Sequence, residues 1–135
     1  MKEILNVCRD LTRKIEQEVE RLQRLKTLAT NITARLDGMP PSPNPSQKVE
    51  NLAAMILDSE NRIKLLHKVR SDCMIELSAW LDGKLSDSRL SNVMFLRYGM
   101  CMSFSSIAKH QNYSERTIFR LHAIGFQKLS VACQY

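Results

Sequence analysis

The chain has few of the residues that interrupt regular structure, with only four glycines and four prolines among 135 residues. An all-β chain turns often and uses both residue types at its turns, so their scarcity argues against that class. No apolar run approaches the roughly 18 residues that are needed to cross a bilayer, and no signal-peptide pattern opens the chain. These absences predict a small soluble protein of the cytoplasm that has no membrane partner.

Patterns typical of metal binding and catalysis are also missing. Cys8, Cys73, Cys101 and Cys133 form no CxxC pair, and the three histidines complete no zinc-ligand spacing. Cys8 and Cys73 fall on apolar helical stripes, where we expect them to pack as small hydrophobic side chains. We find no nucleophile–base set, no glycine-rich phosphate loop and no paired carboxylates. The sequence therefore predicts no metal, no cofactor and no enzymatic activity.

All four prolines lie within residues 37–46, which predicts an extended linker there. On both sides of it, apolar residues recur in alternating steps of three and four, as on a helix with one apolar face. We predict an all-α protein whose domain 1–81 is a long antiparallel helical hairpin, with helices over about 2–35 and 46–81. The two apolar stripes comprise Ile4, Cys8, Leu11, Ile15, Leu22, Leu25, Ala29 and Ile32, then Val49, Leu52, Ile56, Ile63, Leu66, Cys73, Leu77 and Trp80.

Three polar residues interrupt these stripes: Glu18 in the first, and Ser59 and Arg70 in the second. A two-helix hairpin buries only one face of each helix. We therefore expect the long helices to pack against the C-terminal domain or a second protomer. Packing against a second protomer predicts a homo-oligomer that forms through these helices.

Residues 82–135 form the second predicted domain, which contains shorter helices. Ser86 or Asp87 caps a first helix that runs to Tyr98, and Gly99 ends it in a left-handed turn. Ser103 caps residues 104–111, and Ser114 caps a last helix that runs to residue 129. The inward positions expected on this last helix are Ile118, Leu121, Ile124, Phe126 and Leu129.

The spacing of residues 104–129 favours a helix-turn-helix. Ala108 supplies the small residue that lets two helices cross closely, and Asn112 supplies a turn residue that tolerates positive φ. Ile118 and Leu121 follow at a spacing suited to packing against the first helix. A generic three-helix bundle is the alternative, because it needs similar short capped helices.

On charge alone, the distribution favours a solvated basic surface, and a polyanionic partner such as nucleic acid is the alternative. Residues 82–135 hold seven basic and three acidic residues, for a net charge of 7 − 3 = +4, out of +6 on the whole chain. The candidate DNA-binding residues lie on the second helix of the motif and at the end of the first, and are Lys109, His110, Ser114, Glu115, Arg116, Thr117, Phe119 and Arg120.

These residue types suit different contacts with duplex DNA. Arg116 and Arg120 lie four residues apart and can each bind guanine, while Glu115 can accept from a cytosine amino group or offset an arginine. Lys109 and His110 are placed to meet backbone phosphates. Ser114 and Thr117 can bond a phosphate or cap the helix, and Phe119 can pack on Tyr98 or contact a thymine methyl group.

Segments LRYG (96–99), SFSSIA (103–108) and YSERTIFRLH (113–122) resemble region 4 of bacterial sigma factors. They are more similar still to the small sigma-region-4-like regulators encoded by phages and prophages of Gram-positive bacteria. In that family a helical N-terminal half precedes a signature that resembles TNITARLDGMP (30–40) and SPNPSQK (42–48), so the resemblance covers most of the chain. Ser106 departs from the pattern, which usually has an acidic residue there to complete a capping box with Ser103.

This resemblance implies a sequence-specific transcriptional regulator of phage or prophage genes that binds double-stranded DNA in the bacterial host cell. Two other functions stay open. A protein-interaction adaptor would contact RNA polymerase, as sigma region 4 does, or a partner helix. A small terminase-like packaging component would also combine a helix-turn-helix with helical oligomerisation elements.

Overall fold

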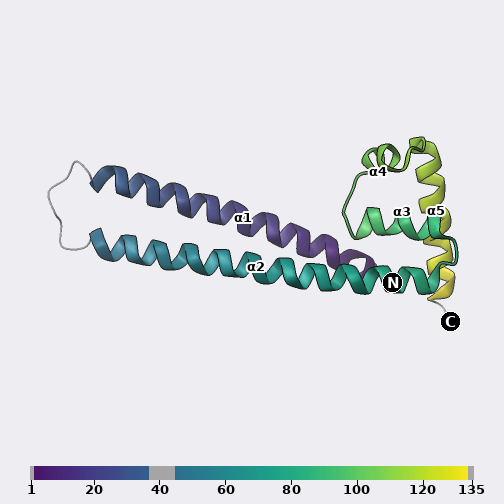
Figure 1. Cartoon of the computed structure of the whole chain (residues 1–135), viewed down its shortest axis with the longest axis horizontal. Coiled ribbons are helices and arrows are strands. Elements are labelled where there is room, and N and C mark those ends of the chain that lie inside the picture. The colour runs from purple at the N-terminus through teal and green to yellow at the C-terminus, as the bar shows by residue number, and fades with distance from the viewer. Residues whose placement is uncertain (1, 37–44, 134–135) are drawn as a thin grey trace. The chain divides into compact units, whose positions relative to one another are not determined.

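The structure is a computed structural model that describes residues 2–36 and 45–133, and these form five α-helices without any strand (Figure 1). The long helices are α1 (Lys2–Leu36) and α2 (Pro45–Lys84). The short ones are α3 (Ser88–Tyr98), α4 (Phe104–Gln111) and α5 (Glu115–Ala132). The predicted all-α class is confirmed. None of the described helices is both long enough and apolar enough to span a membrane.

The predicted linker at 37–46 falls largely on residues 37–44, which lie outside the described residues. Pro45, which we placed in the linker, already belongs to α2, whereas Ser46 lies in α2 as the predicted helix 46–81 has it. Proline suits the first turn of a helix, where its missing N–H has no intrahelical partner to lose. At its other end α2 continues to Lys84 and includes Gly83, beyond the predicted end at residue 81.

The chain divides into two compact units. One comprises residues 1–12 and 69–135 and is called the terminal unit below; the other comprises residues 13–68 and is called the middle unit. Each unit contains a segment of α1 and a segment of α2, because one boundary between the units falls inside α1, after residue 12, and the other falls inside α2, after residue 68.

The terminal unit contains a hydrophobic core to which α1, α2, α3, α5 and the α2–α3 connection all contribute. Leu81 and Leu85 flank the predicted domain boundary, yet both are buried in the same cluster. The division into domains 1–81 and 82–135 therefore stays a prediction. The buried members of this cluster are Leu5, Cys8, Leu77, Leu81, Leu85, Leu90, Met94 and Leu129.

The predicted stripe on α1 is wrong at its first position. Leu5 is buried and Ile4 is exposed, the reverse of the expected arrangement. Leu5 packs in a cluster that includes side chains from α3 and α5. The face of α1 that is buried at this level therefore differs from the face that would be buried if α1 packed against α2 alone. Cys8 is buried, as expected for a cysteine that packs as a small hydrophobic side chain.

The middle unit has little apolar burial and a polar contact between its helices. Ile15 and Leu25 of α1 are buried, and so is the hydroxyl-bearing Ser59 of α2. Ser59 Oγ donates a hydrogen bond of 2.9 Å to Glu18 Oε1, and Arg62 Nη1 donates to the same oxygen at 3.2 Å. Two of the polar residues that interrupt the predicted stripes thus bond to each other.

Side-chain caps begin each of the short helices. The Asp87 carboxylate accepts from the backbone N–H of Arg89, so Asp87 rather than Ser86 caps α3. Ser103 accepts from the N–H of Ser106, and Ser114 accepts from that of Thr117, both at 3.2 Å. The predicted caps at Ser103 and Ser114 are confirmed.

The predicted left-handed turn at Gly99 is wrong. Gly99 has φ −81° and ψ −54°, while Cys101 takes the left-handed conformation with φ 57°. A Cβ at position 99 would lie 2.9 Å from both the ring and the carbonyl oxygen of Phe95. Glycine is therefore required here by a close approach and not by positive φ.

Gly125 lies inside α5 at its contact with α3. A Cβ at this position would lie 3.1 Å from Cγ and 3.2 Å from Sδ of Met94. Ile124, which we expected to face inward, is exposed. The buried position at this level of α5 is occupied by Gly125, where a Cβ would require the Met94 side chain to shift by a few tenths of an ångström.

Candidate nucleic-acid interface

The turn between α4 and α5 is built around Asn112. This residue has φ 58° and ψ 39°, the left-handed conformation that asparagine tolerates better than most residues. The backbone N–H groups of Asn112 and Tyr113 both donate to the carbonyl oxygen of Ala108. The predicted role of Asn112 as the turn residue is confirmed.

A small apolar cluster holds α4 against α5 and α3. Ile107 and Ala108 of α4, Ile118 of α5 and Val93 of α3 are all buried in it. Ala108 is 5% exposed in this cluster, and its role in a close crossing of the two helices stays a prediction. This cluster fixes which face of α5 remains exposed.

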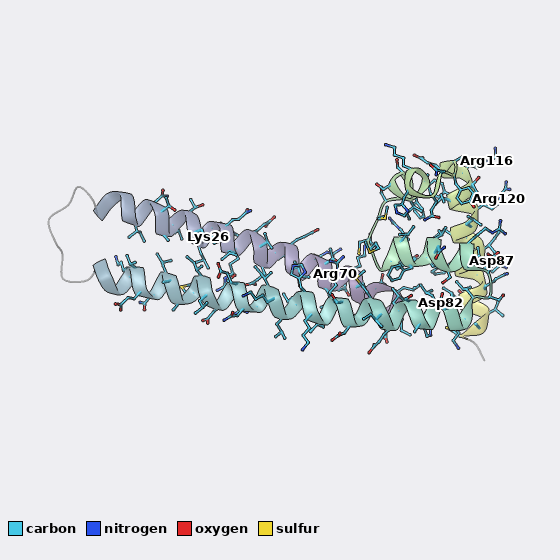
Figure 2. All side chains as sticks on the ribbon, in the orientation of Figure 1. Lys26, Arg70, Asp82, Asp87, Arg116 and Arg120 are labelled. Atoms are coloured by element: carbon cyan, nitrogen blue, oxygen red, sulfur yellow. The ribbon has the colours of Figure 1, made fainter. Side chains whose placement is uncertain are left out.

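The N-terminal half of α5 presents basic side chains to solvent. Arg116 and Arg120 are exposed, one helical turn apart, and Figure 2 locates both on this half of the helix. Neither forms an ion pair within the described parts of the chain. Glu115 and Lys109 are also exposed and likewise lack an ion-pair partner there. Arg116 and Arg120 thus have guanidinium groups that are available to bind an anion or a base edge.

The two hydroxyl residues at the start of α5 bond to each other. Ser114 Oγ caps the helix and lies 2.8 Å from Thr117 Oγ1. Of the alternatives for Ser114, the structure shows the cap. The phosphate role of Thr117 stays a prediction.

His110, at the end of α4, is exposed and also has a local partner. Its Nδ1 lies 3.0 Å from Nε2 of the neighbouring Gln111. The other ring nitrogen has no hydrogen bond within the described residues, so it can reach outward beside Lys109.

Phe119 packs against Phe104, with ring centroids 4.5 Å apart, and keeps 51% of its surface exposed. Tyr98, which we considered as its partner, instead places its hydroxyl 2.8 Å from Nε2 of His122. The His122 ring meets Phe104 edge-on at 5.1 Å. Phe119 is therefore one edge of an aromatic cluster that joins α3, α4 and α5.

Arg97 belongs to this aromatic cluster and not to the exposed basic surface. Its guanidinium lies 4.4 Å from the centroid of the Phe104 ring, and Nη1 donates to the carbonyl oxygen of Met102 at 3.0 Å. Burial lowers the pKa of His122, with a smaller contribution from the Arg97 charge. Sequence reasoning missed the cluster, although aromatic residues at positions 119, 122 and 126 have the spacing of one helical face.

Arg89 is also engaged within the protein. It pairs with the Asp87 carboxylate at 3.2 Å, and hydrogen bonds from Arg89 lower the pKa of that carboxyl. Two of the seven basic residues counted in the C-terminal region, Arg89 and Arg97, therefore have internal partners. The charge that remains available on α4 and α5 comes from Lys109, Arg116, Arg120 and Lys128.

No family model, curated protein or solved structure matches this chain.

Proposed function

We propose that this protein binds double-stranded DNA sequence-specifically, with α4 and α5 acting as a helix-turn-helix and α5 as the recognition helix. The observation that carries the proposal is the pair of exposed, unpaired arginines on the N-terminal half of α5, Arg116 and Arg120. Residues at this end of a recognition helix enter the major groove. The left-handed Asn112 and the buried Ala108 support the proposal, because both are features of the turn and crossing in this motif.

In this proposal Arg116 and Arg120 read base edges, since a guanidinium can bind guanine O6 and N7 together. Lys109 and His110, on the preceding helix, contact backbone phosphates and position the protein. Glu115 accepts from a cytosine amino group, and the exposed edge of Phe119 contacts a thymine methyl group.

The biological role that we propose follows from the resemblance to sigma-region-4-like regulators. The protein controls transcription of phage or prophage genes in the cytoplasm of a bacterial host. RNA polymerase is a possible second partner in this role, since sigma region 4 contacts it.

Selection of bound fragments from random duplex DNA, followed by binding measurements on the selected site, tests the proposal. We expect Arg120→Ala to weaken binding to the selected site by about 1–3 kcal/mol and to relax its preference at one base position. Lys128→Ala removes the same charge from the far end of the same helix and should leave base preference unchanged. Unchanged DNA binding in both Arg116→Ala and Arg120→Ala at moderate salt would exclude α5 as the reading element.

A protein-interaction adaptor is the alternative function, and exposed apolar side chains on α2 favour it. Leu57, Leu65 and Ile75 are each more than half exposed, although large apolar side chains usually cover one another. In this alternative, these exposed side chains of α2 pack against a helix of a partner protein. In the DNA-binding proposal, the long helices pack against those of a second protomer. Light scattering over a concentration series separates these possibilities, because only self-association gives a mass that rises with concentration.

A further inference from the structure

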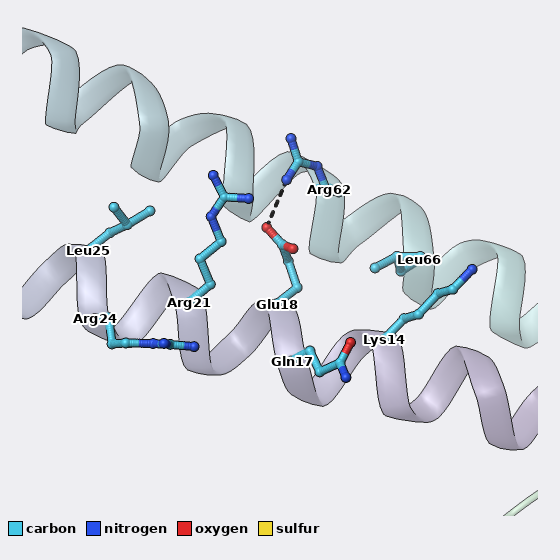
Figure 3. Close-up of a pocket in the computed structure, with 8 residues that line it drawn as sticks. All are labelled: Lys14, Gln17, Glu18, Arg21, Arg24, Leu25, Arg62 and Leu66. Atoms are coloured by element: carbon cyan, nitrogen blue, oxygen red, sulfur yellow. Dashed lines mark hydrogen bonds and ion pairs between the residues drawn. The ribbon is translucent and has the colours of Figure 1, made fainter.

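A cationic pocket lies between α1 and α2 in the middle unit, and none of the residues assigned to DNA recognition lines it. The pocket has a volume of about 630 Å³. Figure 3 shows the side chains of both helices that line it. Lys14, Arg21 and Arg24 reach it from α1, and Arg62 reaches it from α2. Glu18 is the one acidic side chain that lines this pocket.

The single carboxylate is already used by its neighbours. Glu18 Oε1 accepts a hydrogen bond from Arg62 at 3.2 Å (Figure 3). The same oxygen accepts from Ser59 at 2.9 Å. Lys14, Arg21 and Arg24 have no ion-pair partner among the described residues. Three cations that line one pocket are therefore left without an anion.

Part of the wall of the pocket is apolar. Leu25 is buried, Leu66 is half-buried, and both line the pocket beside the cations. Charge-assisted bonds are stronger next to apolar surface than in open water, because less water competes for them. A volume of this size also lies within the range of small-molecule sites.

We propose that this pocket binds the phosphate groups of an anionic ligand, as a second site distinct from α5. Arginine binds phosphate through two parallel N–H donors, and the unpaired guanidinium groups of Arg21 and Arg24 supply such donors. Lys14 adds a third positive charge, which favours a ligand that carries several phosphate charges over a single carboxylate. Two sources have this chemistry: the backbone of duplex DNA and a free nucleoside triphosphate.

Binding of each source to the full-length chain tests the site, with a 30-base-pair duplex in one arm and adenosine triphosphate in the other. Arg21→Ala/Arg24→Ala should weaken binding of one of these probes by about tenfold or more. The matched control, Lys64→Ala/Lys68→Ala, removes two positive charges from exposed positions of α2 that do not line the pocket, and should change affinity by less than about twofold. Loss confined to the duplex identifies the DNA backbone as the source, and loss with the triphosphate identifies a free ligand.

Glu18→Gln provides a test in the opposite direction. It removes the negative charge from the pocket but keeps an oxygen that can accept from Ser59, so the same probe should bind more tightly. The site is overturned if the double arginine variant and its control affect both probes equally, or if Glu18→Gln leaves affinity unchanged.

This result is separable from that for α5. Arg116→Ala/Arg120→Ala should relax base preference without changing triphosphate binding, whereas the pocket variant should leave base preference unchanged. Failure of either site therefore leaves the other result interpretable.

Discussion

The two compact units of the chain bury their side chains in different ways. The terminal unit encloses eight buried residues in its main apolar cluster, drawn from four helices and a connection. Among the described residues of the middle unit, the buried side chains are Ile15, Leu25 and the polar Ser59. Two helices alone leave most of each helix surface in water, so additional elements are needed to bury many side chains together. We therefore expect the terminal unit to provide most of the stability, and the middle unit to retain exposed surface for partners.

The largest loss of stability is expected when a side chain is removed from the buried cluster of the terminal unit. Leu81 is 0% exposed, and Leu81→Ala should lower the free energy of unfolding by about 2–5 kcal/mol, through lost burial and the cavity that remains. Chemical denaturation followed by circular dichroism measures this loss. Leu65→Ala is the matched control in the middle unit: its side chain is 61% exposed, and we expect a change within about 0.5 kcal/mol.

A smaller effect is expected at the polar contact of the middle unit. Glu18→Ala leaves the buried Ser59 hydroxyl without its acceptor, which should cost about 1–2 kcal/mol in the same denaturation experiment. Glu16→Ala removes an equal charge from an exposed position of α1 and should cost much less. A larger loss in Glu18→Ala than in Leu81→Ala would reverse the order of importance of the two units.

The smallest effect is a pH dependence that belongs to the terminal unit. Burial holds the pKa of His122 below its ordinary value of 6.5, so below that pH the unfolded chain takes up a proton more readily than the folded protein. The stability from neutral His122 is fully present above pH 6.5 and declines as the pH falls from there toward the folded-state pKa. Melting temperatures should therefore decrease between pH 7.5 and pH 5.

His122→Gln should reduce this decrease, and His110→Gln, which changes an exposed histidine on α4, should leave it intact. If both variants melt with the pH dependence of the parent protein, His122 is not responsible for it.

The local parts of the fold could be predicted from the sequence. The caps at Ser103 and Ser114 and the turn at Asn112 depend on hydrogen bonds between residues at most five positions apart, so neighbouring residues contain the whole signal. The exposure of Leu5, Ile4 and Ile124 depends on which other helices pack against α1 and α5. The local sequence pattern of a single helix does not contain that information.

The sequence could not predict, for the same reason, which basic side chains are available at the candidate site. Arg97 and Arg116 contribute equally to a count of charges, yet Arg97 lies over the Phe104 ring while Arg116 is exposed. Only the packing of α3 against α4 distinguishes the two. The available positive charge of residues 82–135 is therefore smaller than the count of seven basic residues suggested.

The bond between Glu18 and Ser59 has a further consequence for how α1 and α2 align along each other. A slip by one helical turn would set the Glu18 carboxylate against Ile56 or Ile63, which lie one turn from Ser59 on the same stripe of α2. An apolar residue offers this carboxylate no donor, so the shifted pairing would leave a charge without a hydrogen bond at the interface. Purely apolar seams, by contrast, tolerate several alignments that differ little in energy. This polar layer of the middle unit thus favours one register of its two helices, at some cost in the stability that an apolar pair would add.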